Sequence, residues 1–272
     1  MTVKEHNGGV LVTTPLFNLA DTLDCGQCFR WETDDNLTFK GFYKSNFLKV
    51  TALSDTEIFF HDTDLDTFNG VWRDFFDLDT DYDGFQKVFK KDKTLKKACD
   101  FAGGIRILKQ EPWETLCSFI ISQNNNIPRI KGIIARLCEN FGEKCENGFL
   151  FPAAEVIAKL TVEDLAPLRS GFRAKYILDA ARKVALGEIV LSDIYTMPID
   201  EARKTLMSIK GVGPKVAECA LLFGFYRLEA FPVDTWIKKV LSEYYPDGFP
   251  EYAKKYGGIA QQYLFHYIRN LK

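Results

Sequence analysis

Long hydrophobic runs are absent from this chain of 272 residues. None of its apolar stretches approaches the roughly 18 consecutive residues that a membrane-spanning helix needs, so we expect no membrane partner. The first residues, MTVKEHNGGVLVTTPLF, also lack the long apolar core of a secretory signal. The seven cysteines are odd in number and scattered, which is typical of free thiols in a reducing compartment. These absences predict an intracellular protein with no export signal.

A strong charge of either sign is also missing, because the formal net charge is -2. The charge is distributed unevenly: residues 1–98 carry 12 Lys and Arg against 17 Asp and Glu, whereas residues 99–272 carry 23 against 20. A mildly basic C-terminal part permits local contacts with phosphates but no strong long-range steering. Charge alone therefore neither indicates nor excludes a nucleic-acid partner.

The composition is that of a globular protein, with 46% hydrophobic and 26% charged residues, and the length indicates about two domains. Residues 8–60 contain short segments rich in β-branched and aromatic residues, separated by turn signals, which predict strands. From Glu111 onward the apolar spacing is helical. We therefore predict an α+β protein with a β-rich domain at 1–98 and a helical domain at 99–272. Beyond PWETLCSFIISQ and IPRIKGIIARLCENFG, helices are predicted at 155–160, 162–168, 174–186, 200–207, 214–225, 233–245 and 251–270.

Two short patterns are typical of metal sites but lack the partners that such sites require. The acidic stretch 79–84 matches half of an EF-hand loop, yet Lys90 stands where the bidentate glutamate belongs. Cys25 and Cys28 have the spacing of a zinc ligand pair, but no second pair accompanies them. We expect a solvated loop and two half-buried strand residues instead, and no metal or cofactor.

The most informative stretch is TLMSIKGVGPKVAECALLFGFYRLEAFPVDTWIKKV, residues 205–240. Gly211 and Gly213 predict a tight turn between two helices, and Pro214 is suited to the first turn of the second helix. This spacing, over about 200–225, is that of a helix-hairpin-helix, whose exposed backbone N–H groups hold a DNA phosphate. A plain helical hairpin with a glycine turn explains the glycines equally well.

Lys215 lies in the first turn of that second helix, where the helix dipole disfavours a cation. Partial desolvation acts in the same direction, so that a neutral amine able to form a Schiff base becomes accessible. Asp234 follows in PVDTW and could stabilise positive charge on a sugar ring. The alternatives are a charged lysine that contacts phosphate and an aspartate that only caps a helix.

GVGPKVA and PVDTW together resemble the glycosylases of the helix-hairpin-helix superfamily, and within it the 8-oxoguanine DNA glycosylase/apurinic-site lyases. The resemblance covers nearly the whole chain. Four further segments match signatures of that family in the same order: LDCGQCFRW (23–31), GIRILKQEPWETLCSFIISQNNNIPRI (104–130), LRSGFRAKYI (168–177) and AQQYLFHYI (260–268). The resemblance implies a sheet like that of the TATA-binding protein, followed by the helical glycosylase domain.

The resemblance also implies the reaction. Lys215 attacks the sugar carbon that bears the damaged base, and the imine permits strand cleavage by β-elimination. Asp234 stabilises the oxocarbenium-like state. The residues implied to bind the flipped base are Phe265 and Cys219 on its two faces, Gln261 at its Watson–Crick edge, and the carbonyl of Gly26 at the N7–H of 8-oxoguanine.

Further residues are implied to hold the DNA. Asn124 fills the space that the base vacates, and Arg129 and Arg173 read the orphaned cytosine, with Phe172 beside them and Gly211 and Gly213 at the backbone. The chain departs from the animal and fungal members at three positions: Trp236 replaces a phosphate-contacting histidine, Ile268 replaces its acidic partner, and Phe172 replaces a tyrosine. We expect Trp236 to pack rather than contact phosphate. No cysteine follows Cys219, which excludes the C-terminal iron–sulfur cluster of the endonuclease III branch.

The function expected from the sequence is excision of 8-oxoguanine opposite cytosine, followed by lyase cleavage. The expected partner is double-stranded DNA with a damaged base, bound by a monomer. Two rivals remain open: a helix-hairpin-helix glycosylase for oxidised pyrimidines or alkylated purines, and a DNA-binding module without catalysis.

Overall fold

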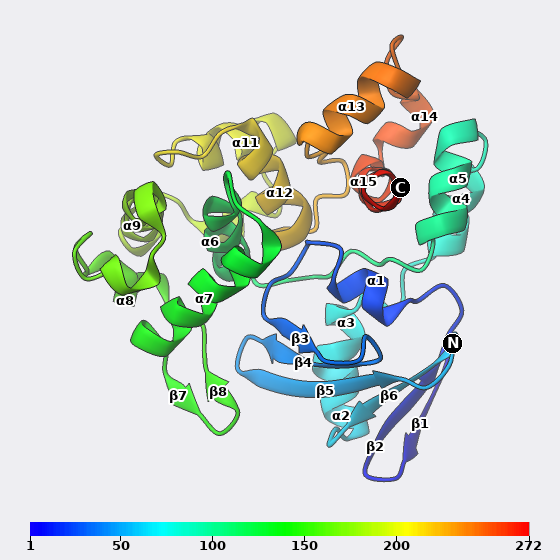
Figure 1. The fold of residues 1–272 in the computed structure, drawn as a ribbon, viewed down its shortest axis with the longest axis horizontal. Coiled ribbons are helices and arrows are strands. Elements are labelled where there is room, and N and C mark those ends of the chain that lie inside the picture. The colour runs from blue at the N-terminus through cyan, green and yellow to red at the C-terminus, as the bar shows by residue number, and fades with distance from the viewer. Residues whose placement is uncertain (272) are drawn as a thin grey trace.

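The computed structural model describes residues 1–271. An antiparallel sheet occupies the N-terminal part, and a larger assembly of helices follows it (Figure 1). The predicted α+β class is thereby confirmed. Within residues 1–271, no helix has both the length and the apolar content to cross a membrane.

The sheet has six strands in the order β1-β2-β6-β5-β4-β3, and each neighbouring pair is antiparallel. Phe60 in β6 lies opposite Val10 on one side and Val50 on the other, and all three are fully buried. The strands are β1 (Thr2–His6), β2 (Gly9–Thr13), β3 (Trp31–Thr33), β4 (Thr38–Tyr43), β5 (Asn46–Ala52) and β6 (Glu57–His61).

A nearly continuous helical stretch covers the apolar face of the sheet. It consists of α2 (Leu65–Thr67), a π-helical turn at Phe68–Trp72 and α3 (Arg73–Phe75). Phe68, Trp72, Phe75 and Phe76 are buried there, and the ring of Phe75 stacks on that of Trp31 with 5.7 Å between centres. Large aromatic rings bury much area each, so this small sheet has a core of its own.

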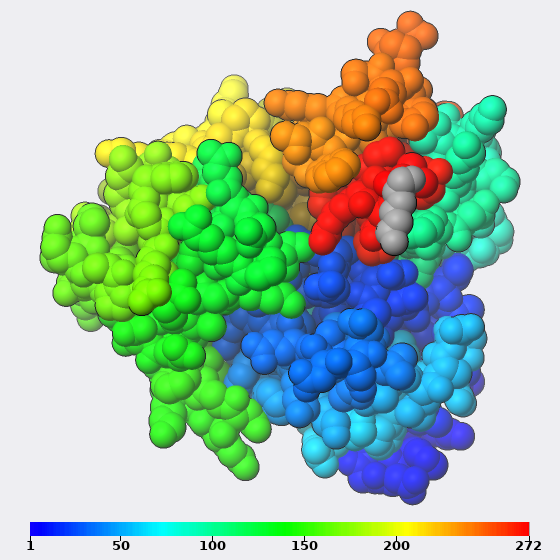
Figure 2. Space-filling model, viewed as in Figure 1, coloured from blue at the N-terminus to red at the C-terminus, as the bar shows by residue number. Residues whose placement is uncertain are grey.

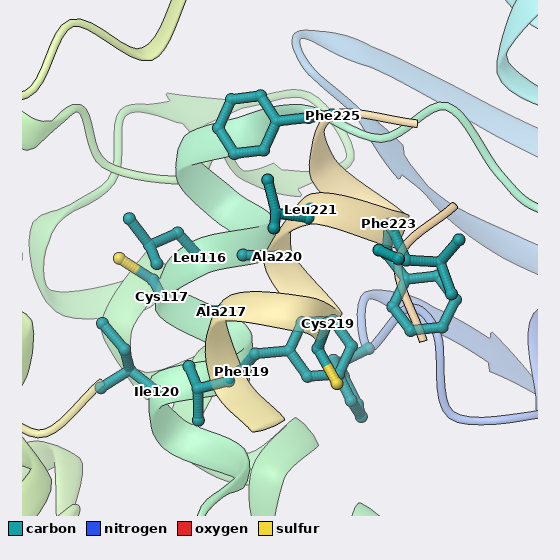
Figure 3. Close-up of a cluster of buried hydrophobic side chains, with 14 of the residues drawn as sticks. Leu116, Cys117, Phe119, Ile120, Ala217, Cys219, Ala220, Leu221, Phe223 and Phe225 are labelled. Carbon is teal, nitrogen blue, oxygen red and sulfur yellow. The ribbon is translucent and has the colours of Figure 1, made fainter. Parts of the chain in front are cut away.

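The helical part is built around two helices that are buried along most of their length, α6 (Pro112–Ser122) and α12 (Pro214–Gly224). They pack along each other, and their side chains interleave (Figure 3). The rings of Phe119 and Phe223 stack with 5.3 Å between centres. Around this pair lie α7 (Ile127–Phe141), α8 (Ala154–Ala158), α9 (Ala174–Ala185), α10 (Leu191–Ile194), α11 (Ile199–Met207), α13 (Thr235–Tyr244), α14 (Glu251–Lys254) and α15 (Gly257–Asn270).

Three short elements complete the fold. Helix α1 (Leu19–Leu23) connects β2 with the loop before β3, and strands β7 (Lys144–Cys145) and β8 (Gly148–Phe149) form a small hairpin after α7. Helices α4 (Tyr82–Phe89) and α5 (Lys93–Ala102) follow the sheet in sequence, but their apolar faces are buried in the helical core, where α5 packs on α15. The division at residue 98 remains a prediction.

Two predicted helices differ from the observed ones. The stretch 162–168 contains a turn and a short 3₁₀ segment, Ala166–Leu168, which ends at Arg169 in the left-handed conformation. The predicted helix 251–270 is divided into α14 and α15. The second helix begins at Gly257 and Gly258, and a Cβ atom at Gly258 would overlap the side chain of Leu222 in α12. Glycine at 258 thus lets the start of α15 approach Leu222 of α12 closely.

Candidate active site

A small cavity lies where α12, α15, α6 and the loop after α1 meet. Its volume is about 50 Å³. It is lined by Cys25, Gly26, Phe119, Lys215, Cys219, Phe223, Pro232, Asp234, Gln261, Gln262 and Phe265. The list includes all of the catalytic and base-binding residues that the sequence predicts. On the face shown in Figure 2, the orange α13 and red α15 lie across a recess from the green segment around α7.

Helix α12 brings the amine and the thiol into the cavity. Gly213 precedes the helix without a side-chain cap, and Pro214 occupies its first turn. Lys215 and Cys219 are one helical turn apart, so they lie on the same face. The Nζ atom of Lys215 is 5.3 Å from the centre of the Phe119 ring. Burial raises the pKa of the Cys219 thiol, and the charge of Lys215 opposes part of that rise.

Asp234 caps α13 and also lines the cavity. Its Oδ1 atom accepts a hydrogen bond of 2.8 Å from the backbone N–H of Ile237. Lys215 and Asp234 line the same cavity, and the ion pairs among residues 1–271 include none between them. Asp234 therefore caps α13, and its side chain also lies at the cavity; whether it only caps the helix stays open.

Helix α15 supplies the residues on the other wall. Its close approach to α12 at Gly258 places Gln261 and Phe265, three and seven residues later, on the face that meets α12. Gln261 is only 4% exposed, and its Oε1 atom has no hydrogen-bond partner within residues 1–271. A buried acceptor without a partner costs about 1–3 kcal/mol, and this one lies in the wall of the cavity.

The loop that carries Gly26 is held rigidly from several sides. Gly26 has φ of +85°, a conformation that favours glycine. Gln262 of α15 donates a hydrogen bond of 3.2 Å to the carbonyl of Cys25. Gln27 donates to the carbonyls of Thr22 at 2.9 Å and Arg106 at 2.8 Å. The backbone at Gly26 is therefore fixed before any ligand binds.

The expectation that Cys25 and Cys28 are half-buried strand residues is wrong. Both are buried, and they lie in the loop between α1 and β3. Burial raises the pKa of Cys25 to about 12. Such a thiol is unreactive at neutral pH. Within residues 1–271, no group of three or more His, Cys, Asp and Glu side chains is placed to hold a metal ion.

A second group of predicted residues lies outside the cavity, at the turn between α6 and α7 and at the start of α9. Asn124 is exposed in the left-handed conformation, with φ of +46°, and Arg129 is exposed in the first turn of α7. Phe172 is also exposed, and the guanidinium of Arg173 lies 4.4 Å from the centre of its ring.

Arg173 lies against the backbone of the neighbouring turn, and its contact with an orphaned cytosine stays a prediction. It is buried, and its guanidinium donates to three backbone carbonyls, those of Gln123, Asn124 and Ser170. Burial and the nearby charge of Arg129 lower the pKa of Arg173. In this conformation Arg173 holds the turn at Asn124, and the exposed Arg129 is the arginine directed to solvent.

The hairpin between α11 and α12 has the geometry that its glycines predict. Gly211 has φ of +81°, and a Cβ atom there would overlap the ring of Tyr176. Gly213 is extended, with open space around it. The turn thus requires glycine at 211 for both conformation and space, whereas the backbone at 213 is open to a ligand.

The expectation that Trp236 packs into the protein is wrong, because this side chain is 42% exposed in the first turn of α13. Ile268, in contrast, is buried.

Sequence reasoning missed five cavity residues: Cys25, Phe119, Phe223, Pro232 and Gln262. The two phenylalanines lie in apolar helices and give no signal that separates them from core residues. Gln262 is adjacent to Gln261 in a helix that is otherwise largely apolar, and that pair of amides was the available signal.

Comparison with known proteins identifies the family of the chain. The family model of the 8-oxoguanine DNA glycosylase N-terminal domain matches residues 10–116, and that of HhH-GPD superfamily base excision DNA repair proteins matches residues 117–253. The chain is 35% identical over 261 residues to an N-glycosylase/DNA lyase of Saccharomyces cerevisiae, covering 84% of this chain and 68% of the relative.

Solved structures are similar over nearly the whole chain. An 8-oxoguanine glycosylase/lyase of Clostridium acetobutylicum, in complex with double-stranded DNA containing cytosine opposite 8-oxoguanine, is 37% identical with a TM-score of 0.90, covering 99% of this chain and 98% of that one. MBOgg1, solved with a low-affinity DNA ligand, is 40% identical with a TM-score of 0.90, covering 98% of both chains. The chain therefore belongs to the 8-oxoguanine DNA glycosylase family of the HhH-GPD superfamily.

Proposed function

We propose that this protein is a bifunctional DNA glycosylase and apurinic-site lyase that excises 8-oxoguanine opposite cytosine from duplex DNA. One observation carries the proposal: a single cavity holds Lys215, Asp234 and the four residues expected to bind the base. Membership of the family and the DNA complex of the similar clostridial enzyme support it.

In the proposed reaction the neutral amine of Lys215 attacks C1′ of the deoxyribose. The bond from C1′ to N9 breaks, and the base leaves with the electron pair and takes up a proton. Asp234 stabilises the positive charge that develops on the sugar, an effect that is strong in a water-excluded site. Ring opening gives the Schiff base, and loss of a C2′ proton then expels the 3′ phosphate.

The missing ion pair between the two groups is consistent with this division of labour. A lysine bound tightly to Asp234 would be held in its charged form, which is not nucleophilic. Lys215 stands in the first turn of α12, directly after Pro214, and its side chain lines the cavity.

The side chains that line the cavity suit a flipped purine, but the cavity of the free protein is too small to hold one. A volume of about 50 Å³ holds a few water molecules and no base. Binding therefore requires the lining to open, and Phe265, which is only partly buried, is the aromatic side chain placed to move. Once the base is inserted, Phe265 and Cys219 cover its faces, Gln261 binds its Watson–Crick edge and the Gly26 carbonyl accepts the N7–H. Base–aromatic stacking contributes ~1–3 kcal/mol.

Extruding a base from the duplex costs a few kcal/mol, which inserted side chains must offset. We propose that Asn124 fills the gap, and that Phe172 and Arg129 contact the opposite strand. The exposure of these three side chains around one turn supports that role. Arg173 reaches the orphaned cytosine only if its bonds to the turn carbonyls rearrange. Gly211 and Gly213 shape the hairpin that holds the phosphate backbone. We place the protein inside the cell, as a monomer that needs no cofactor.

The proposal is tested by borohydride trapping on a duplex with one 8-oxoguanine opposite cytosine. We expect a covalent protein–DNA complex with the wild-type protein and none with Lys215→Gln, which keeps its affinity for the duplex. Trapping that persists in Lys215→Gln would exclude Lys215 as the nucleophile, and no trapping in the wild type would favour a passive DNA-binding module. Parallel duplexes with oxidised pyrimidines or alkylated purines test the rival substrates.

Asp234→Asn provides a second test of the same site. Asparagine caps a helix as well as aspartate does, so we expect unchanged stability. Loss of the charge is expected to slow excision about 100-fold, a typical effect for one stabilising group. Single-turnover excision measures this effect, and an unchanged rate would remove Asp234 from the mechanism.

A further inference from the structure

Glu218 is a buried carboxylate that the proposed reaction does not use. It lies on α12 between Lys215 and Cys219, yet it is not part of the cavity lining. Its side chain is largely inaccessible, with the whole residue 8% exposed. A buried carboxylate is costly unless it is paired and hydrogen-bonded, so its partners are informative.

Both oxygens of Glu218 are used, and each joins a different segment. Oε1 forms an ion pair with the Nε atom of Arg203 on α11, and Arg203 also contacts Asp200 at 2.5 Å. Oε2 accepts a hydrogen bond of 2.7 Å from the backbone N–H of Phe231. One side chain thus connects both helices of the hairpin with the segment that precedes α13.

That segment ends in the carboxylate of the site. Phe231 precedes Asp234 by three residues, and Pro232, between them, is buried in the cavity wall. On its far side the segment is fixed by the cap that Asp234 forms on α13. The hydrogen bond at Phe231 therefore holds the first residue of the segment 231–234, and Asp234 is its last residue.

The separation of Lys215 from Asp234 must be set indirectly, because no direct ion pair joins them. Glu218 lies one helical turn after Lys215, on the same rigid helix, and holds the backbone that leads to Asp234. We propose that Glu218 is a positioning residue, which fixes Asp234 at the distance from Lys215 that excision requires. This inference rests on the proposed function.

The two chemical steps depend on this distance differently. Excision requires Lys215 and Asp234 to act on the same sugar, so a shift of Asp234 slows it. Formation of a Schiff base on an abasic site that already exists requires the amine of Lys215 and no departing base. Loss of Glu218 is therefore expected to separate the two activities.

The experiment compares Glu218→Ala and Glu218→Gln with the wild type in two assays at 25 °C. Single-turnover excision of 8-oxoguanine is expected to fall about 100-fold in Glu218→Ala, the scale of a misplacement of about 1 Å. Borohydride trapping on a preformed abasic duplex is expected to stay within about threefold of wild type, because an intact Lys215 needs no departing base. Glutamine can still accept the N–H of Phe231. Excision in Glu218→Gln should therefore be about 10-fold slower than in the wild type and about 10-fold faster than in Glu218→Ala.

Two further variants distinguish positioning from loss of stability. Arg203→Gln breaks the ion pair but leaves the bond to Phe231, and should affect excision less than Glu218→Ala does. Glu201→Gln, at an exposed position of α11, should match the wild type in both assays. Melting temperature and duplex affinity are measured for each variant. If Glu218→Ala does not fold, Glu218→Gln must still show the preferential loss of excision.

Equal losses in both assays, or an excision loss in Arg203→Gln as large as in Glu218→Ala, would overturn the positioning role. So would unchanged excision in both Glu218 variants. If the wild type neither excises 8-oxoguanine nor is trapped on abasic DNA, the proposed function itself fails, which is a separate result.

Discussion

At the scale of single residues, two neighbouring amides of α15 have opposite roles. Gln262 is satisfied, because its Nε2 atom donates to the carbonyl of Cys25. Gln261 is buried with its Oε1 atom unpartnered within residues 1–271. Unsatisfied groups of this kind cost stability in the free protein and become useful when a ligand supplies the missing hydrogen bond. They are expected at functional sites, where fold and function make conflicting demands.

This contrast predicts opposite effects of the same substitution at the two positions. Gln261→Leu removes the unpaired oxygen, so the free energy of unfolding should rise by about 1 kcal/mol, whereas Gln262→Leu should lower it by about 1 kcal/mol. Excision of 8-oxoguanine should fall in Gln261→Leu despite the added stability. Urea unfolding and single-turnover excision measure the two effects. A destabilised Gln261→Leu would show that its amide is already satisfied.

At the scale of elements, the site depends on how closely α15 approaches α12. Gly258 of α15 faces Leu222 of α12. Helix α12 contributes Lys215 and Cys219 to the cavity, and α15 contributes Gln261 and Phe265. Helical spacing places the residues of each helix on one face, but only the contact between the helices makes those faces meet.

Gly258→Ala should therefore affect stability and activity together. Its Cβ atom would overlap Leu222, and overpacking of a core typically costs about 1–3 kcal/mol. Excision should fall as well, because the wall with Gln261 and Phe265 moves away from α12. Gly132→Ala in α7, where a Cβ atom meets only Arg136 at 3.4 Å, is the matched control and should be neutral or stabilising. A Gly258→Ala protein as active and stable as wild type would show that the helices can separate freely.

At the scale of the whole molecule, a buried polar cluster joins the sheet part to the helical part. Asp77, which follows α3, accepts hydrogen bonds from Tyr82 at 2.9 Å and from Tyr226 at 2.5 Å. Arg106 donates to the backbone carbonyl of Asp77 at 2.7 Å. Tyr226 follows α12, the helix whose first turn contains Lys215. The cluster therefore connects the C-terminal end of α12 with the N-terminal part of the protein.

The cysteines give the molecule a predictable response to alkaline pH. Burial raises the pKa of Cys25, Cys99 and Cys138 from 9.0 to about 12, and also raises that of Cys28, Cys117 and Cys219. The folded state therefore binds more protons than the unfolded state above pH 9.0. Their contribution to stability is complete below that pH and is lost as the pH rises toward 12.

Urea unfolding should accordingly show a lower free energy of unfolding at pH 10 than at pH 8. Iodoacetamide at neutral pH provides the matching check, since Cys145 is the one partly exposed cysteine among the described residues and should be alkylated first. A free energy that is constant or rises across this pH range, or early alkylation of Cys25, would contradict the buried thiols.

The sequence by itself determined the features that depend on neighbours along the chain. The hairpin turn at Gly211, the first-turn positions of Pro214 and Lys215 and the cap at Asp234 follow from local backbone geometry and helical spacing, and the structure contains all of them. The α+β class followed from the change of apolar period near residue 111. The residues assigned to the cavity came from motifs of the family, and their chemical roles remain predictions.

Tertiary structure decided what depends on contacts between distant segments. Gly26 and Gln261 share a cavity although they are far apart in the chain, because α15 approaches α12 at Gly258 and the loop after α1 is held by Gln262. The predicted helix 251–270 is divided into α14 and α15. Arg173 is buried against backbone carbonyls, and Trp236 is exposed although we expected it to pack. Burial is a property of the surrounding packing, and the periodicity of one segment contains no information about which other segment covers it.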